Sequence, residues 1–145
     1  MSSRFNVQRQ RGFTLLELLV VIVIIGMLVG FVAPDFFRQL GKSETTTARA
    51  QMTALAKALD NYRLDNGRYP SSEQGLRSLL EKPAGASHWQ GPYLRGALPL
   101  DPWGNPYLYR FPGSAGPDFD LMSLGKDGQS GGQDEAADLT HGIAS

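Results

Sequence analysis

The longest apolar segment of the chain runs from Phe13 to Ala33 and contains one charged residue, Glu17. A helix rises about 1.5 Å per residue, so a segment of this length can cross the hydrocarbon core of a bilayer. Pro34 follows directly, and a proline within a helix removes a backbone hydrogen bond and kinks the axis. The pattern therefore predicts a membrane-spanning helix over residues 13–34.

After Pro34 the hydrophobic pattern narrows to one face. Apolar side chains recur at intervals of four, three, four and three residues, at Ala48, Met52, Leu55, Leu59 and Tyr62. This spacing is typical of an amphipathic helix. Asn66 and Gly67 supply a suitable stop. Residues 35–66 are therefore predicted to continue the membrane helix as one long rod whose apolar face packs on a core.

The remaining part of the chain, residues 67–145, holds most of the 17 glycines and 9 prolines. Ser71 or Ser72 could cap a short helix that ends near Pro83. Two short strands are predicted at residues 107–111 and 119–124, joined by a loop rich in glycine and proline. These elements indicate one small, loop-rich domain.

Charge is distributed unevenly although the formal net charge is zero. Residues 1–12 carry three arginines (Arg4, Arg9 and Arg11) and no acid. Basic residues beside an apolar span favour the cytoplasm, so the C-terminal domain is expected outside it. The chain has no basic patch and is not expected to bind nucleic acid. It also has no cysteine, so a domain outside the cytoplasm must be stabilised by its packing, a metal or its neighbours.

The junction between Gly12 and Phe13 is a candidate cleavage site. Cleavage there would free an α-amine on Phe13, one helical turn from Glu17. A carboxylate within an apolar span is costly unless it has a partner, and this amine is a suitable cation.

The segment Gly12-Phe13-Thr14-Leu15-Leu16-Glu17 resembles the class III signal of type IV pilins and pseudopilins. The resemblance implies that a prepilin peptidase cuts after Gly12 and methylates the amine of Phe13. It also implies that Glu17 serves assembly by pairing with the terminal amine of a neighbouring subunit. An ordinary secretory signal and a plain single-span anchor are the alternatives. The apolar run is too long for the first, and the second explains neither Gly12 nor Glu17.

Four further motifs narrow the resemblance to the major pseudopilins of type II secretion systems. They occupy residues 65–70, 73–76, 101–104 and 123–128, with the sequences Asp-Asn-Gly-Arg-Tyr-Pro, Glu-Gln-Gly-Leu, Asp-Pro-Trp-Gly and Ser-Leu-Gly-Lys-Asp-Gly. The resemblance implies an α+β fold in which a long N-terminal helix packs on a small antiparallel β-sheet with a loop-rich C-terminal region.

The implied function is structural. A family member is anchored in the bacterial inner membrane, with its C-terminal domain in the periplasm, and forms a homopolymeric pseudopilus that drives export of folded proteins. The implied partners are minor pseudopilins, the prepilin peptidase and an inner-membrane assembly platform. Two alternatives stay open: a type IV pilin or minor pseudopilin, and a single-span calcium-dependent binding module that does not polymerise.

The acidic loop, residues 124–139, is the candidate metal site. Four carboxylates lie among four glycines in this segment. Calcium binds carboxylate and carbonyl oxygens, and glycines let carbonyls turn toward an ion. Composition alone leaves both a solvated loop and a calcium site open. The resemblance implies one calcium ion, with the side chains of Asp127 and Asp138 and the carbonyls of Leu124 and Gln129 as ligands. The further candidates are Ser130, Asp134 and Glu135.

Other chemistry-bearing residues give no coherent site. His88 and His141 lie far apart in the sequence without cysteine or histidine beside them, so a zinc site is not expected. Trp89 and Trp103 are expected to pack against the core. The sequence contains no catalytic constellation and does not indicate an enzyme.

Overall fold

The computed structural model describes residues 13–141 of the chain. It divides into two compact units between Gln39 and Leu40. The elements in chain order are α1 (Leu15–Asn66), the 3₁₀ helix η1 (Leu76–Leu79), β1 (Leu108–Arg110), β2 (Asp120–Ser123), the 3₁₀ helix η2 (Asp134–Ala136) and β3 (Leu139–His141). This is the predicted α+β fold.

The helix α1 contains 52 residues and begins with a side-chain cap. The backbone amide of Glu17 donates a hydrogen bond to Oγ1 of Thr14 at 3.2 Å. The helix then continues through Pro34 without interruption. Because proline has no amide hydrogen, the carbonyl of Gly30 lacks its usual helical donor at this position.

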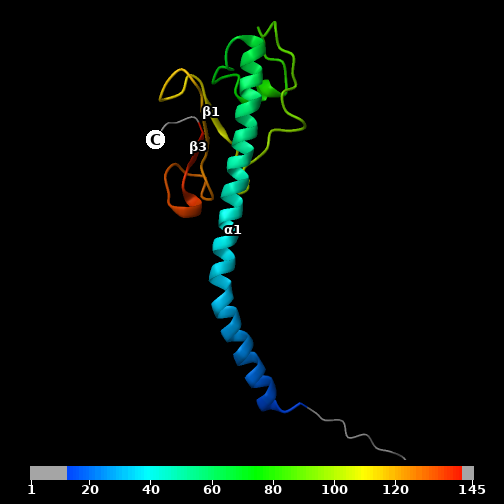
Figure 1. Cartoon of the computed structure of the whole chain (residues 1–145), viewed down its shortest axis with the longest axis vertical. Helices are drawn as coiled ribbons and strands as arrows, with labels where there is room; N and C mark the ends of the chain where they lie inside the picture. The colour runs from blue at the N-terminus through cyan, green and yellow to red at the C-terminus, as the bar shows by residue number, and fades with distance from the viewer. Residues whose placement is uncertain (1–12, 142–145) are drawn as a thin grey trace, which may run out of the picture. The chain divides into compact units, whose positions relative to one another are not determined.

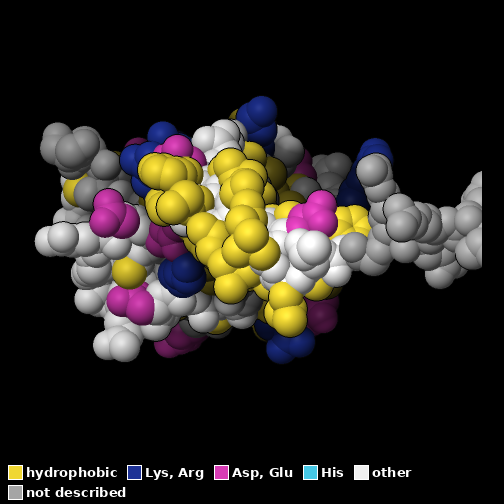
Figure 2. Space-filling view, turned by 90° about the horizontal axis from the view of Figure 1, so that it is seen from below, with side chains coloured by type: hydrophobic (Ala, Val, Ile, Leu, Met, Phe, Trp, Pro, Cys, Tyr) yellow, Lys and Arg dark blue, Asp and Glu magenta, His cyan; other side chains and the backbone are white. Residues whose placement is uncertain are grey.

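Large apolar side chains of the N-terminal unit are exposed. From Phe13 to Phe37 almost every leucine, isoleucine, valine and phenylalanine is about half exposed or more. Figure 2 shows hydrophobic side chains gathered in one broad patch. Within residues 13–141, α1 is the helix that is long and apolar enough to cross a membrane. A lipid environment would remove this surface from water, as predicted for residues 13–34.

The C-terminal half of α1 packs on a three-stranded antiparallel sheet in the order β1-β2-β3 (Figure 1). All five residues of the predicted apolar face are buried, from Ala48 to Tyr62. They meet Leu79, Leu121 and Leu139 in one core. Leu121 lies in the central strand, opposite Tyr109 of β1 and His141 of β3.

Two of the three strands in the described residues lie where the sequence predicts them. β1 and β2 lie within the two predicted ranges. The third strand, β3, was not predicted. It contains three residues, which is too few to show an alternating pattern.

The segment after α1 begins with a capped turn. Oγ of Ser71 accepts from the amide of Gln74 at 3.2 Å, and Oε1 of Gln74 accepts from the amide of Ser71 at 3.0 Å. This is the reciprocal bonding of a capping box. The predicted helix does not follow, however, because Gly75 has a φ of 58° and breaks the helical backbone. Only the single 3₁₀ turn η1 forms after it.

Asp101 fastens the turn before β1 to the end of β2. Its side chain is almost fully buried and accepts hydrogen bonds from the amides of Trp103 and Asn105 and from Oγ of Ser123, at 3.1, 2.7 and 2.7 Å. Trp103 then donates from Nε1 to Glu44 on α1 at 2.9 Å. Trp89 packs against the same core, so both tryptophans have the predicted packing role.

Candidate functional site

The first candidate site is the start of α1. Phe13 is 76% exposed and Glu17 lies in the first turn of the helix. Residues 1–12, including Gly12 and the predicted cleavage point, lie outside the described residues. The ion pairs found in residues 13–141 involve other carboxylates, those of Asp35, Asp118 and Glu135.

Thr14 belongs to this site, and the sequence interpretation overlooked it. The spacing Thr14-x-x-Glu17 is that of a capping box. In the structure the threonine caps the amide of Glu17. An acid in the first turn is also favoured by the helix dipole. The threonine cap and the helix dipole thus act on the first turn of α1. The carboxylate of Glu17 stays available for a cation from outside the subunit.

The second candidate feature is the segment around Pro34. A Cβ added at Gly26 or at Gly30 would meet no atom within 4 Å. Both glycines therefore leave open surface where a neighbouring helix can approach closely. Asp35, directly after the proline, forms an exposed ion pair with Arg38.

The acidic loop, residues 124–139, connects β2 to β3. Ser123 pairs with Leu139 in the sheet, so Leu124 and Asp138 flank the same end of the ladder. Gly125 has a φ of 65°, and a Cβ there would lie 2.9 Å from the carbonyl oxygen of Ala137. The two ends of the loop are therefore held together by β3, which the sequence analysis had missed.

The two carboxylate oxygens of Asp138 have different surroundings. Its Oδ2 accepts from the amide of Gly131 at 2.9 Å and from Oγ of Ser130 at 3.4 Å. Its Oδ1 is buried and has no hydrogen-bond partner. A buried carboxylate oxygen without a partner is unfavourable, and a cation at this point would satisfy it.

The other acidic residues of the loop each have different surroundings. Oδ1 of Asp127 accepts from the amide of Gln129 at 3.1 Å in a local turn. Asp134 is exposed and has a φ of 53°. Oε2 of Glu135 accepts from Nζ of Lys126 at 2.6 Å, which turns this carboxylate toward the lysine.

A cation in this loop would have to be bound largely by oxygen atoms of the backbone. In the described part of the chain, no group of three or more histidine, cysteine, aspartate or glutamate side chains is close enough to hold a metal. Two carboxylates with carbonyls and a hydroxyl match the preference of calcium, which takes 6 to 8 oxygens.

The charge of Glu135 raises the pKa of Lys126 above its ordinary value through a hydrogen bond and direct attraction, with a smaller contribution from Glu44. A raised lysine pKa favours the folded state at low and neutral pH, and this contribution is lost as the pH rises through that pKa. The pair therefore persists at neutral pH.

Elsewhere, burial and then the charge of Asp101 raise the pKa of Tyr107 to about 12, so this phenol stays neutral.

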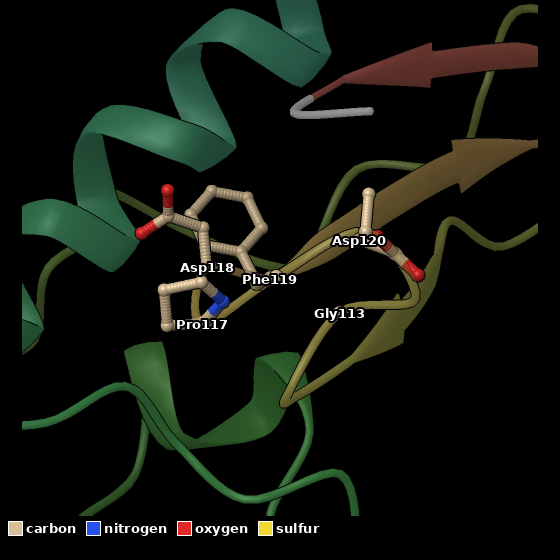
Figure 3. A pocket seen from close by; sticks show the side chains of 7 residues that line it. Gly113, Pro117, Asp118, Phe119 and Asp120 are labelled. Carbon is tan, nitrogen blue, oxygen red and sulfur yellow. The ribbon is translucent and has the colours of Figure 1, made fainter. Parts of the chain in front are cut away.

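A small pocket of about 210 Å³ lies in the loop between β1 and β2. Figure 3 shows the carboxylates of Asp118 and Asp120 pointing away from each other. Asp120 accepts from the amide of Ser114 at 2.8 Å, and Asp118 lies 3.8 Å from Arg63. Both carboxylates thus have partners within the chain, so we do not assign a ligand to this pocket.

Comparison with known proteins gives consistent matches. The family described as "Type II secretion system (T2SS), protein G" matches residues 35–142, and the "Prokaryotic N-terminal methylation motif" matches residues 7–33. The chain is 47% identical to type II secretion system core protein G of Pseudomonas aeruginosa, over 91% of this chain and 94% of the relative. It is 43% identical to the protein of the same name from Vibrio cholerae, over 92% of each.

A solved structure agrees with the sequence matches. The crystal structure of the major pseudopilin from the type 2 secretion system of enterohaemorrhagic Escherichia coli superposes with a TM-score of 0.61. Its sequence is 38% identical, and the match covers 74% of this chain and 93% of that one.

Proposed function

Because this chain belongs to the protein G family of type II secretion systems, it is a structural pseudopilus subunit and not an enzyme, and we propose that its acidic loop binds one calcium ion. The observation that supports the calcium site is the buried Oδ1 of Asp138, which has no partner. When bound, calcium supplies a divalent charge that cross-links the two ends of the loop. Asp127 and Asp138 provide the side-chain oxygens in this proposal, with the carbonyls of Leu124 and Gln129.

The proposed cross-link takes the place of a disulfide in a chain without cysteine. The loop has four glycines with positive φ (Gly125, Gly128, Gly131 and Gly132), so its unfolded form has high chain entropy. Its carboxylates repel one another when they are brought together. A bound divalent cation would offset both effects and hold β3 at the edge of the sheet.

At the N-terminus we propose cleavage after Gly12 and methylation of the amine of Phe13. The methylation motif covers this junction, and α1 provides one apolar span suited to an inner-membrane anchor. The arginines of residues 1–12 favour the cytoplasmic side, which would place the C-terminal domain in the periplasm. There the subunit would join a homopolymer together with minor pseudopilins and an inner-membrane assembly platform, and the fibre would drive export of folded proteins.

Processing is tested by mass spectrometry of the chain extracted from membranes. The expected N-terminal residue is N-methylated Phe13, with residues 1–12 removed. The same chain from cells without the prepilin peptidase is the control and should retain Met1. An intact Met1 in peptidase-containing cells would instead support a simple anchor that does not polymerise.

Pro34 is expected to matter in the assembled fibre. Gly26 and Gly30 have low helix propensity, and Pro34 leaves the carbonyl of Gly30 without a donor. We predict that residues near 26–34 lose regular helix in the fibre, so that each subunit lengthens, although α1 is continuous in the isolated subunit. A fibre map by electron cryomicroscopy would show this directly. Unbroken hydrogen bonding from each residue to the fourth before it through this segment would rule the prediction out.

A further inference from the structure

Gly41 is a buried position in an exposed part of α1. Its neighbours Leu40 and Lys42 are both exposed. The backbone here is ordinary α-helix, so no unusual φ requires glycine. Glycine in a helix lowers stability relative to alanine, and its presence at this position needs another reason.

The reason lies in a residue of the acidic loop. A Cβ added at Gly41 would collide with Oε1 of Glu135 and would lie 2.6 Å from its Cδ and 2.8 Å from its Cγ. The side chain of Glu135 therefore lies across the helix in the space that the missing Cβ leaves. By contrast, a Cβ at Gly26 or Gly30 would meet nothing.

Glu135 is held in this position by Lys126 from the other side of the loop. Nζ of Lys126 donates to the glutamate carboxylate at 2.6 Å, and the amide of Lys126 donates to the carbonyl of Glu135 at 3.0 Å. Only 33% of the glutamate side chain is exposed. One turn along α1, Glu44 accepts from Trp103 at 2.9 Å. The acidic loop is thus attached to α1 at Gly41, and the turn that holds Trp103 is attached one helical turn away at Glu44.

We propose that Glu135 is a positioning residue that seats the acidic loop on α1, with Gly41 as the notch that receives its side chain. The carboxylate of Glu135 is then committed to Lys126 and is not a metal ligand, which leaves Asp127 and Asp138 for the cation. The effect of Glu135 on metal binding rests on the proposed calcium site, whereas its contact with α1 at Gly41 does not.

A double-mutant cycle in excess chelator tests the seat without metal. Thermal unfolding and amide hydrogen exchange are measured on the full chain in detergent micelles for Gly41→Ala, Glu135→Ala and the double variant. Alanine favours the helix but displaces Glu135. In the wild type, Gly41→Ala should therefore raise the melting temperature less than in the Glu135→Ala background, or lower it. It should also accelerate exchange in residues 134–137 by about tenfold, a coupling of the size that contacting residues show.

The control for helix propensity is Ala50→Gly, at an exposed position of the same helix. It should change the melting temperature equally with and without Glu135. If Gly41→Ala raises the melting temperature by the same amount in both backgrounds, Gly41 and Glu135 are not coupled and the seat is refuted.

Calcium titration by calorimetry separates positioning from ligation. Gly41→Ala and Glu135→Ala should each weaken calcium binding by about tenfold with one site retained, an effect of the size typical for residues that orient ligands. Glu135→Gln keeps the size and an acceptor for Lys126, and it should bind nearly as the wild type does. Loss of the site in Glu135→Gln but not in Gly41→Ala would show that Glu135 is a ligand. If the wild type binds no calcium, the metal site is refuted, and the chelator cycle still decides the seat.

Discussion

Replacing Glu17 with alanine is expected to abolish fibre assembly and secretion while processing and membrane insertion continue. The carboxylate lies in an apolar span, where a charge without a partner is strongly unfavourable. The amine of Phe13 on an adjacent subunit is the proposed cation, and the pair would fix the axial register between subunits. Removing one partner of a buried pair costs about 3–5 kcal/mol, enough for a loss of at least ~100-fold in a subunit contact.

Fibre yield is measured by chemical cross-linking of the subunit in intact cells and quantifying the polymer ladder, with secreted protein in the medium as the second readout. Glu17→Gln keeps the shape but removes the charge, and it should fail in the same way. The matched control is Asp35→Ala, which removes another acid from the same helix. Asp35 forms an exposed ion pair with Arg38. Such exposed pairs contribute about 0–1 kcal/mol, so fibres should form. A normal yield from Glu17→Ala would show that Glu17 has no role in assembly.

The long helix could be predicted from the sequence because its signals are local. The apolar run from Phe13 to Ala33 and the stripe that ends at Tyr62 each repeat over several turns, and the structure buries every residue of the stripe. Asn66 is the last residue of α1, as its position before Gly67 indicated. The helix expected after Ser71 was wrong in type, since Gly75 breaks the backbone after one capped turn.

The features that were missed depend on contacts between distant parts of the chain. β3 contains three residues and is defined by its pairing with β2. Because β3 fixes the place of Asp138, the geometry of the acidic loop could not be derived without it. Gly41 did leave a signal, since it continues the buried stripe seven residues before Ala48. The residue that fills its notch, Glu135, lies 94 positions away and nothing local indicates it.

Removing calcium is expected to lower the melting temperature of the full chain in detergent micelles. Stabilisation by a ligand that binds only the folded state grows by about 1.4 kcal/mol for each tenfold rise in free ligand above the dissociation constant. For a domain of this size, each kcal/mol shifts the melting temperature by roughly 4–8 °C. The melting temperature should therefore rise with the logarithm of the free calcium concentration. Magnesium should restore it poorly because it requires a tighter octahedral shell.

Variants of the proposed ligands should remove this response. Asp127→Ala should melt low with or without calcium and should fail to form fibres. Asp138→Asn removes the charge next to the buried Oδ1, so it should lower the melting temperature in calcium but differ much less from the wild type in chelator. Glu81→Ala is the control, because it removes an exposed acid outside the loop and should keep the full calcium response. A wild-type melting temperature that is the same in chelator and in millimolar calcium would mean that residues 124–139 form only a solvated acidic loop.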